Sequence, residues 1–281
     1  MGPEVLAITY GISSAILWGT GDFSAGFASK KSGVLAVVLF SQLVGAVFLI
    51  ALAFYISDPL PPFRHLIYGS LAGLVGICGL IALYAGLSRG RMGIVAPLSA
   101  VVTALIPIGV SFFREGLPAT GKLLGLGLAL FSVWLLSYTK SEHGNYRFSE
   151  LALPLLAGIG FGLFFVLIDS ASQESVLWPL VGARFMSLPL VLILFLLKSD
   201  TRIPAKNQLP LIAVAGVFDV LGNLFFALAT HIGRLDISAT LSSLYPATTV
   251  FLAWLIIKER LLPQQWVGVA VALVALILIA H

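Results

Sequence analysis

The sequence predicts an all-α polytopic membrane protein with ten transmembrane helices arranged as two inverted five-helix repeats. Three observations lead to this fold class. Hydrophobic residues make up 59% of the 281 residues and charged residues only 10%, whereas a soluble domain carries about 25% charged residues. Apolar stretches of bilayer length follow one another along the chain. The second half of the chain repeats sequence features of the first half.

The predicted spans are apolar runs bounded by charges, Gly or Pro. A helix needs about 20 apolar residues to cross the hydrocarbon core. Ten runs meet this need, at 5–28, 33–56, 66–88, 92–113, 119–138, 150–170, 176–197, 208–230, 237–257 and 264–280. The polar stretch 139–149 is the natural linker between the halves. We therefore expect a first five-helix repeat at 1–138 and a second at 150–281.

The internal duplication is visible at three places in the chain. Each is a short motif near a predicted helix end, and the spacing between copies shifts only slightly. The matched pairs are Trp18…Asp22 with Phe165…Asp169, 90–94 with 233–237, and Phe112-Phe113-Arg114-Glu115 with Ile256-Ile257-Lys258-Glu259. Duplicated sets of membrane spans are typical of transporters that bind substrate between their two halves.

An odd number of spans per repeat means that the second repeat enters the membrane upside down. The predicted loops place 11 Lys and Arg on one side of the membrane and 4 on the other. Because positively charged loops stay in the cytoplasm, both chain termini are predicted to lie outside.

Several motifs carry a resemblance to a known family. They are Ala15-Ile16-Leu17-Trp18-Gly19 in the first span, Leu241-Ser242-Ser243-Leu244-Tyr245-Pro246 followed by Glu259, and Lys258-Glu259-Arg260 with Trp266-Val267-Gly268 after it. The chain resembles the drug/metabolite transporter superfamily, specifically its ten-span EamA-type members. That resemblance implies transport of a small solute, in a family that handles amino acids, sugars, nucleotides, drugs and other metabolites. The sequence departs from the commoner pattern at Asp22 in the first span and around Pro97.

Three acids and one base lie inside predicted spans: Asp22, Asp169, Asp219 and Arg184. Ionisable groups in a membrane cost about 2.5–3.5 kcal/mol each on insertion scales, and they mark functional sites by default. One of the acids is expected to bind a cationic substrate group or to exchange a proton. In the alternative interpretation, Arg184 pairs with Asp219 or Asp169 as a structural bridge.

The other candidate substrate-binding residues are Trp18, Tyr84, Asn223 and Tyr245. Asp219 and Asn223 are four residues apart, so they share one face of a helix. The three aromatic side chains could stack on a solute or offer hydroxyl groups, or they could serve only in helix packing. Pro246, directly after Tyr245, removes a backbone donor and predicts a kink in the ninth span.

The leading hypothesis is a secondary transporter that moves a small amphipathic or zwitterionic metabolite by alternating access, with export preferred from the resemblance alone. The solute gradient or protons would supply the energy. A channel or a lipid-translocating protein is the alternative, and an intramembrane enzyme ranks last. The chain has no nucleotide-binding loop, metal-ligand motif or hydrolase motif, so no cofactor, metal or catalytic residue is expected.

The expected partners are the solute and the lipid bilayer. The basic residues form no run that could follow a nucleic-acid backbone, so no nucleic acid is expected. With ten spans available for packing, we expect a monomer, a multi-pass protein of the bacterial cytoplasmic (inner) membrane.

Overall fold

The computed structural model describes residues 2–29, 31–87, 92–137, 151–197, 203–258 and 262–280, and all of its regular structure is helical. The helices are α1 (Pro3–Ser29), α2 (Val34–Ile56), α3 (Phe63–Leu87), α4 (Met92–Glu115), α5 (Thr120–Ser137), α6 (Ala152–Ala171), α7 (Leu177–Leu197), α8 (Leu209–Ile232), α9 (Leu235–Ser242), α10 (Tyr245–Leu252) and α11 (Pro263–Ala280). A short 3-10 turn, η2 (Lys206–Gln208), precedes α8, and a π-helical segment, η3 (Ala253–Ile257), follows α10.

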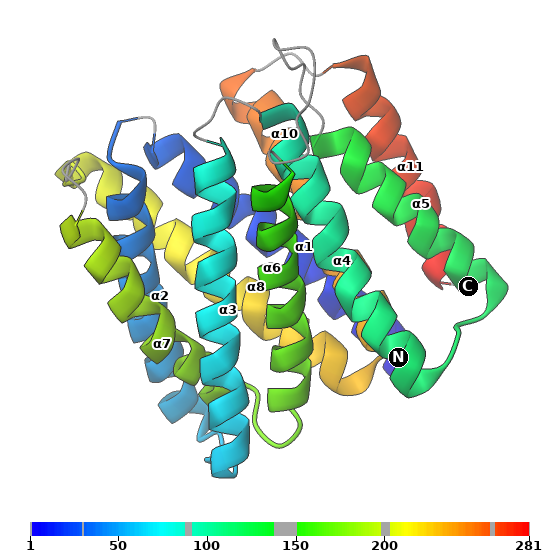
Figure 1. The fold of residues 1–281 in the computed structure, drawn as a ribbon, viewed down its shortest axis with the longest axis horizontal. Helices are drawn as coiled ribbons and strands as arrows, with labels where there is room; N and C mark the ends of the chain where they lie inside the picture. The colour runs from blue at the N-terminus through cyan, green and yellow to red at the C-terminus, as the bar shows by residue number, and fades with distance from the viewer. Residues whose placement is uncertain are drawn as a thin grey trace.

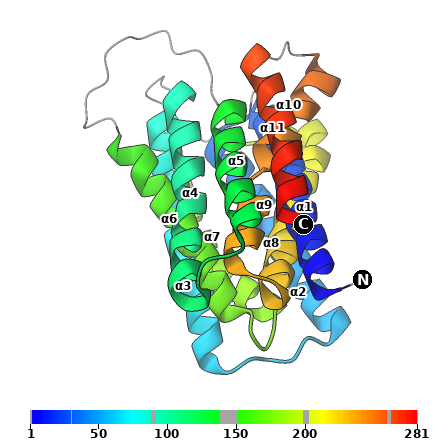
Figure 2. The ribbon, with the colours of Figure 1, turned by 90° about the vertical axis from the view of Figure 1, so that its right-hand side faces the viewer.

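Within these residues, seven helices are long and apolar enough to cross a membrane, and α5 and α11 are shorter apolar helices. The helices stand side by side as one bundle (Figures 1 and 2). Large apolar side chains cover its outside, among them Phe54, Phe113 and Leu197, which are 68%, 86% and 78% exposed. In water such a surface would drive aggregation, whereas in a bilayer it faces lipid. The chain is an integral, multi-pass membrane protein, as its composition predicted.

Helices from the two halves of the chain pack against each other. The main pairs across the halves are α1 with α8, α3 with α6 and α7, α2 with α7 and α8, α4 with α6 and α9, and α5 with α11. The α5–α11 pair stands at one edge of the bundle (Figure 1). There the Ser132 hydroxyl donates to the Gly268 carbonyl at 2.9 Å. A core formed in this way requires both halves of the chain.

The ninth span is interrupted rather than continuous. The helix stops at Ser242, turns through Ser243 and Leu244, and restarts as α10. Pro246 lies in the first turn of α10 and has no N–H to donate back to the carbonyl of Ser242, so the regular hydrogen-bond ladder cannot continue. The interruption lies where the proline predicted a kink, and it positions Tyr245 at the helix start.

Asp58, in the connection between α2 and α3, caps the start of α7. Its carboxylate accepts hydrogen bonds from the Ser175 hydroxyl at 2.6 Å and from the Leu177 backbone N–H at 3.0 Å. The Trp178 indole donates to the Asp58 carbonyl at 2.9 Å. The cap therefore ties the first half of the chain to the second.

We expect Asp58→Ala to lower the free energy of unfolding by about 1–2 kcal/mol, because it leaves the Leu177 N–H and the O–H of the buried Ser175 without an acceptor. Asp58→Asn keeps an acceptor oxygen and should lose less than half as much. Denaturant titration of the purified protein in detergent measures both. Equal stability of the alanine variant and the parent would show that the cap contributes nothing.

Candidate functional site

A cavity of about 780 Å³ lies inside the bundle. Its walls come from α1, α2 and α3 of the first half and from α6, α7 and α8 of the second, with Thr103 of α4 and Tyr245 of α10 reaching it as well. The polar and large aromatic residues that line it are Trp18, Asp22, Ser29, Gln42, Thr103, Phe161, Phe164, Phe165, Arg184, Ser187, Asp219, Asn223 and Tyr245. The cavity is thus shared by the two halves and is large enough for a small organic molecule.

The cavity brings most of the predicted site residues together. Trp18, Asp22, Arg184, Asp219, Asn223 and Tyr245 all line it. Asp169 does not, and the side chain of Tyr84 falls outside the part of α3 whose side chains are described. Phe161 and Phe164 were not predicted from the sequence, because phenylalanine is ordinary in membrane helices.

Close contact between α1 and α8 places the two cavity acids next to each other. The Ser14 hydroxyl donates to the Gly222 carbonyl at 2.9 Å. One turn further along α1, the indole of Trp18 lies directly over Gly222. At Gly21 the helices are so close that a Cβ would lie 3.4 Å from the backbone nitrogen of Asp219. Asp22, the next residue, lines the same cavity as Asp219, and the two carboxyl groups are near enough to interact electrostatically.

Arg184 forms an ion pair with Asp219, one of the two partners expected for it. The guanidinium and the carboxylate form an ion pair at the cavity wall, and the two side chains are 14% and 45% exposed. Asn223 donates its amide to the backbone carbonyl of Asp219 at 2.6 Å, which ties that amide to its own helix. Asp22 makes no ion pair or hydrogen bond among the described residues, and its side chain is open to the cavity.

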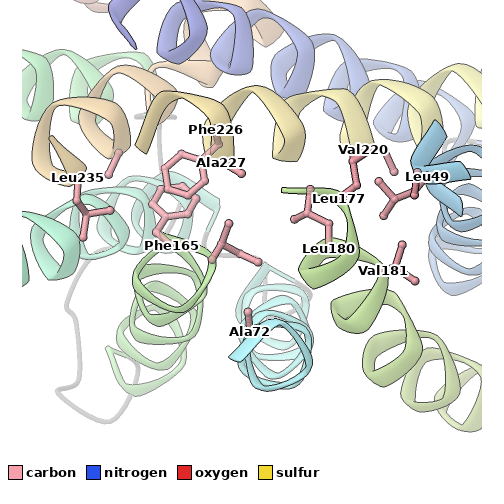
Figure 3. Close-up of a cluster of buried hydrophobic side chains, with 13 residues drawn as sticks. Leu49, Ala72, Phe165, Leu177, Leu180, Val181, Val220, Phe226, Ala227 and Leu235 are labelled. Atoms are coloured by element: carbon pink, nitrogen blue, oxygen red, sulfur yellow. The ribbon is translucent and has the colours of Figure 1, made fainter. Parts of the chain in front are cut away.

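One end of the cavity is closed by three stacked aromatic rings. Phe165 of α6 and Phe226 of α8 stack with ring centroids 4.4 Å apart, and Trp18 lies over Phe165 at 5.5 Å. Figure 3 shows the two phenylalanine rings facing each other within a buried apolar cluster. Phe165 is 5% exposed and Phe226 is fully buried, so no path for a solute runs between them.

Polar contacts hold the same end together beyond the rings. Arg114 at the end of α4 forms an ion pair with Asp169 near the end of α6, with 3.3 Å between nitrogen and oxygen. His65 of α3 and His231 of α8 donate to the carbonyls of Ala171 and Ser172, at 3.0 and 2.9 Å. The end of α6 is thereby tied to α3, α4 and α8. We call this region, with the three rings, the closed end.

Arg234 adds to the closed end from the start of α9. It donates to both carboxylate oxygens of Asp236, at 3.1 and 3.0 Å, and to the carbonyl of Gly116 at 2.7 Å. The hydrogen bonds with Asp236 raise the pKa of the Arg234 guanidinium, so this link between the halves stays charged. The sequence marked Arg234 only as part of the duplicated segment 233–237 and not as a functional residue, because a lone arginine after an apolar run looks like an ordinary loop residue.

The position of Asp169 corrects the expected pairing. Its partner is Arg114 of the first half, not Arg184, and it lies outside the cavity at the closed end. Arg184 is held by Asp219 on the other side of the aromatic stack. Asp22 and Asp169, which match in the duplication, therefore occupy different environments.

The opposite end of the cavity reaches the place where α1 ends and α2 begins. Its lining includes Ser29, the last residue of α1, and Val34, the first residue of α2, which is 43% exposed. No ion pair links α1 to η3 or Lys258 among the described residues at this end. We call it the open end. Among the residues that the structure describes, side-chain contacts close the cavity at one end only, an arrangement expected of a membrane transporter with two halves.

Comparison with known proteins agrees with this class. The chain belongs to the EamA-like transporter family, whose sequence model matches residues 5–138 and again residues 148–281. The resemblance to the drug/metabolite transporter superfamily is thereby confirmed. An uncharacterized protein of Methanocaldococcus jannaschii, MJ1333.1, is 29% identical over 134 residues, which are 47% of this chain and 96% of that protein.

One solved crystal structure of another protein superposes on this chain with a TM-score of 0.78. The match covers 97% of this chain and 95% of the other, at 14% sequence identity. At that identity the match supports the fold alone.

Proposed function

We propose that the protein is a secondary transporter that moves a small organic metabolite by alternating access between two inverted five-helix repeats, 1–138 and 150–281. One observation carries the proposal. The cavity between the halves is closed at one end by stacked aromatic rings with an ion pair beyond them, and the sequence duplicates of that ion pair have no ion-pair partner among the described residues. A carrier that closes each end in turn needs such equivalent contacts at both ends.

The packing supports an inverted relation between the halves. The α1–α8 pair has its counterpart in α6–α3, and the α2–α8 pair in α7–α3, while α5 meets α11 and α4 meets α9. Exchanging the halves therefore reproduces the pairing pattern. In Figure 1, α3 and α5 run upward, and their counterparts α8 and α11 run downward. The similar protein of M. jannaschii has about the length of one half of this chain.

The duplication identifies the contact that would close the open end. Arg114 matches Lys258, and Asp169 matches Asp22. Since Arg114 and Asp169 pair at the closed end, their duplicates, Lys258 and Asp22, are expected to pair when the open end closes. Neither has an ion-pair partner among the described residues in the present state. We call the Arg114–Asp169 and Asp22–Lys258 contacts the two latches.

The transport cycle then has a simple electrostatic form. In the present state the Arg114–Asp169 latch is closed and the cavity admits solute past Ser29 and Val34. In the opposite state the Asp22–Lys258 latch forms and the first latch opens. If the loops richer in Lys and Arg are cytoplasmic, the open end faces the cytoplasm, which is where an exporter loads its solute. The setting proposed is a monomer in a bacterial cytoplasmic membrane.

The decisive experiment is uptake by proteoliposomes. A carrier shows saturable uptake of labelled solute and counterflow when unlabelled solute is loaded inside. Non-saturating flux would indicate a channel, and transfer of labelled phospholipid between leaflets would indicate a lipid-translocating protein. Repeating the uptake with an imposed pH gradient tests coupling to protons through Asp22 or Asp219. Absence of saturation and counterflow for every solute class would reject the carrier.

The two latches predict that Arg114→Gln and Lys258→Gln have different effects on access to the cavity. With Cys78 replaced by serine and a single cysteine placed at Leu80 in the cavity, a membrane-impermeant maleimide reports access from the open end. Arg114→Gln weakens the closed end, so we expect labelling to fall, and the equilibrium constant between the two states obtained from it to shift about 2–5-fold toward the opposite state, in line with roughly 0.5–1 kcal/mol for a partly exposed ion pair. Lys258→Gln removes a contact that is absent in this state, so labelling should not fall although transport does. Equal falls in labelling for both variants would contradict the latch assignment.

A further inference from the structure

The charges that face the cavity do not balance. Asp22 and Asp219 contribute two carboxylates, and Arg184 is the one base among the described lining residues. Arg184 is already paired with Asp219. That leaves Asp22 as a carboxylate without a counter-ion, open to a cavity at membrane depth. An unpaired carboxylate charge in such a place is costly, so the group either takes up a proton or gains a cationic partner.

Apart from the neighbouring Arg184–Asp219 pair and a few small polar side chains, the walls of the cavity are apolar and aromatic. Trp18 lies one turn before Asp22 on α1, and Phe161, Phe164 and Phe165 of α6 line the same cavity. The faces of aromatic rings attract ammonium groups within about 6 Å of the ring centroid. They also pack well against a flat organic body. The cavity therefore offers one negative group and a large apolar surface.

We propose that the transported solute is an organic cation, an ammonium group carried on an aromatic or otherwise apolar body, with the ammonium bound at Asp22. This inference rests on the proposed function, because it names the solute class of the same cavity. A zwitterion would need a second, free cation for its carboxylate, and Arg184 is held by Asp219. An anion would meet Asp22 without compensation. The charge count thus selects an amine over an amino acid.

The same carboxylate belongs to the proposed latch at the open end, which gives solute release a physical cause. When the open end closes, the ammonium of Lys258 approaches Asp22. Lys258 and the ammonium of the solute then compete for one carboxylate. Closure at this end weakens solute binding while the opposite end opens, so the solute leaves on the other side.

A matched set of probes tests the solute class. We would measure binding of 2-phenylethylamine, phenylalanine, 3-phenylpropionate and 2-phenylethanol to the purified full-length protein by calorimetry. These share one aromatic body and differ in charge. We expect the amine to bind at least 10-fold more tightly than each of the others. Equal or tighter binding of phenylalanine or 3-phenylpropionate would overturn the proposal.

Two variants test the position of the ammonium. Asp22→Asn keeps the shape of the side chain and should weaken amine binding more than 10-fold. Glu174→Gln removes a carboxylate that lies outside the cavity and should leave the affinity unchanged. A ligand-free melting temperature near that of the parent shows that Asp22→Asn is folded. If folded Asp22→Asn still binds the amine as well as the parent does, Asp22 is not the site.

Flux measurements separate this proposal from the proposed function. Saturable uptake with counterflow of an anionic or neutral solute, without amine binding, would reject the proposal that the solute is an organic cation. It would leave the proposal of a secondary transporter standing. Amine binding that depends on Asp22, without saturable uptake or counterflow, would support the ammonium site at Asp22 and reject the proposal of a secondary transporter. Both proposals hold if the amine is taken up with saturation and the Asp22→Asn variant loses that uptake.

Discussion

Replacing Gly160 by leucine is expected to abolish folding of the protein. Gly160 of α6 crosses Gly79 of α3 with almost no space between the two backbones. A Cβ at Gly160 alone would lie 2.7 Å from the Gly79 Cα and 2.7 Å from the Val75 carbonyl oxygen. Backbone atoms cannot turn aside as a flexible side chain can, so α3 and α6 would have to separate. Overpacking by a few methylene groups already costs about 1–3 kcal/mol, out of a total stability of roughly 5–15 kcal/mol.

The matched control is Gly127→Leu on α5. Gly127 has no heavy atom within 4 Å of a built Cβ, and it is exposed on the outside of the bundle. Leucine there should meet lipid and leave the protein folded. Size-exclusion chromatography in detergent distinguishes the two variants, with Gly160→Leu aggregated and Gly127→Leu monodisperse. A monodisperse Gly160→Leu variant with normal thermal unfolding would show that the α3–α6 contact is not as tight as described.

The helices themselves could be predicted from the sequence because the bilayer sets their length. The predicted span 33–56 corresponds to α2 (Val34–Ile56), and the predicted span 92–113 corresponds to α4 (Met92–Glu115). The pairing of helices could not be predicted in the same way. A helix that is apolar all round has no polar face to show which side meets protein and which meets lipid. Close approach at Gly79 and Gly160 depends on both helices at once, and neither glycine reveals its partner.

The candidate site was predictable where one helix carries the information. The four-residue spacing of Asp219 and Asn223 was enough to predict that they share one face of α8. Asp22 and Arg184 were predicted as candidates because charged residues are rare within membrane spans. Contacts between distant segments were not predictable. Arg114 was predicted to lie in a loop, and nothing in its local sequence links it to Asp169, which lies 55 residues away along the chain.

Asp22 and Asp169 show a further limit of sequence reasoning. The duplication makes them equivalent, yet one lies open to a cavity and the other is paired with Arg114. In the proposed cycle the two environments exchange, so their present difference belongs to a conformational state and not to the residues. A sequence encodes both states at once and cannot show which one is populated.

The Arg184–Asp219 ion pair predicts the second large effect. Arg184→Gln should lower the free energy of unfolding by about 1–3 kcal/mol, because Asp219 loses its counter-ion at membrane depth. Breaking a fully buried pair costs about 3–5 kcal/mol. A smaller loss is expected here because the Asp219 side chain is 45% exposed to the cavity, where water screens its charge. Asp219→Asn leaves a guanidinium unpaired and should also destabilise.

The double variant distinguishes an ion pair from two independent contributions. Arg184→Gln with Asp219→Asn places two neutral amides side by side, which can hydrogen-bond to each other. Its loss of stability should be smaller than the sum of the single losses by at least about 1 kcal/mol, the coupling energy of residues in direct contact. Denaturant titration in one detergent, with a common slope for all four proteins, measures this coupling. Additive losses would mean that Arg184 and Asp219 do not stabilise each other, and Arg184 would then be free to bind an anionic group of the solute.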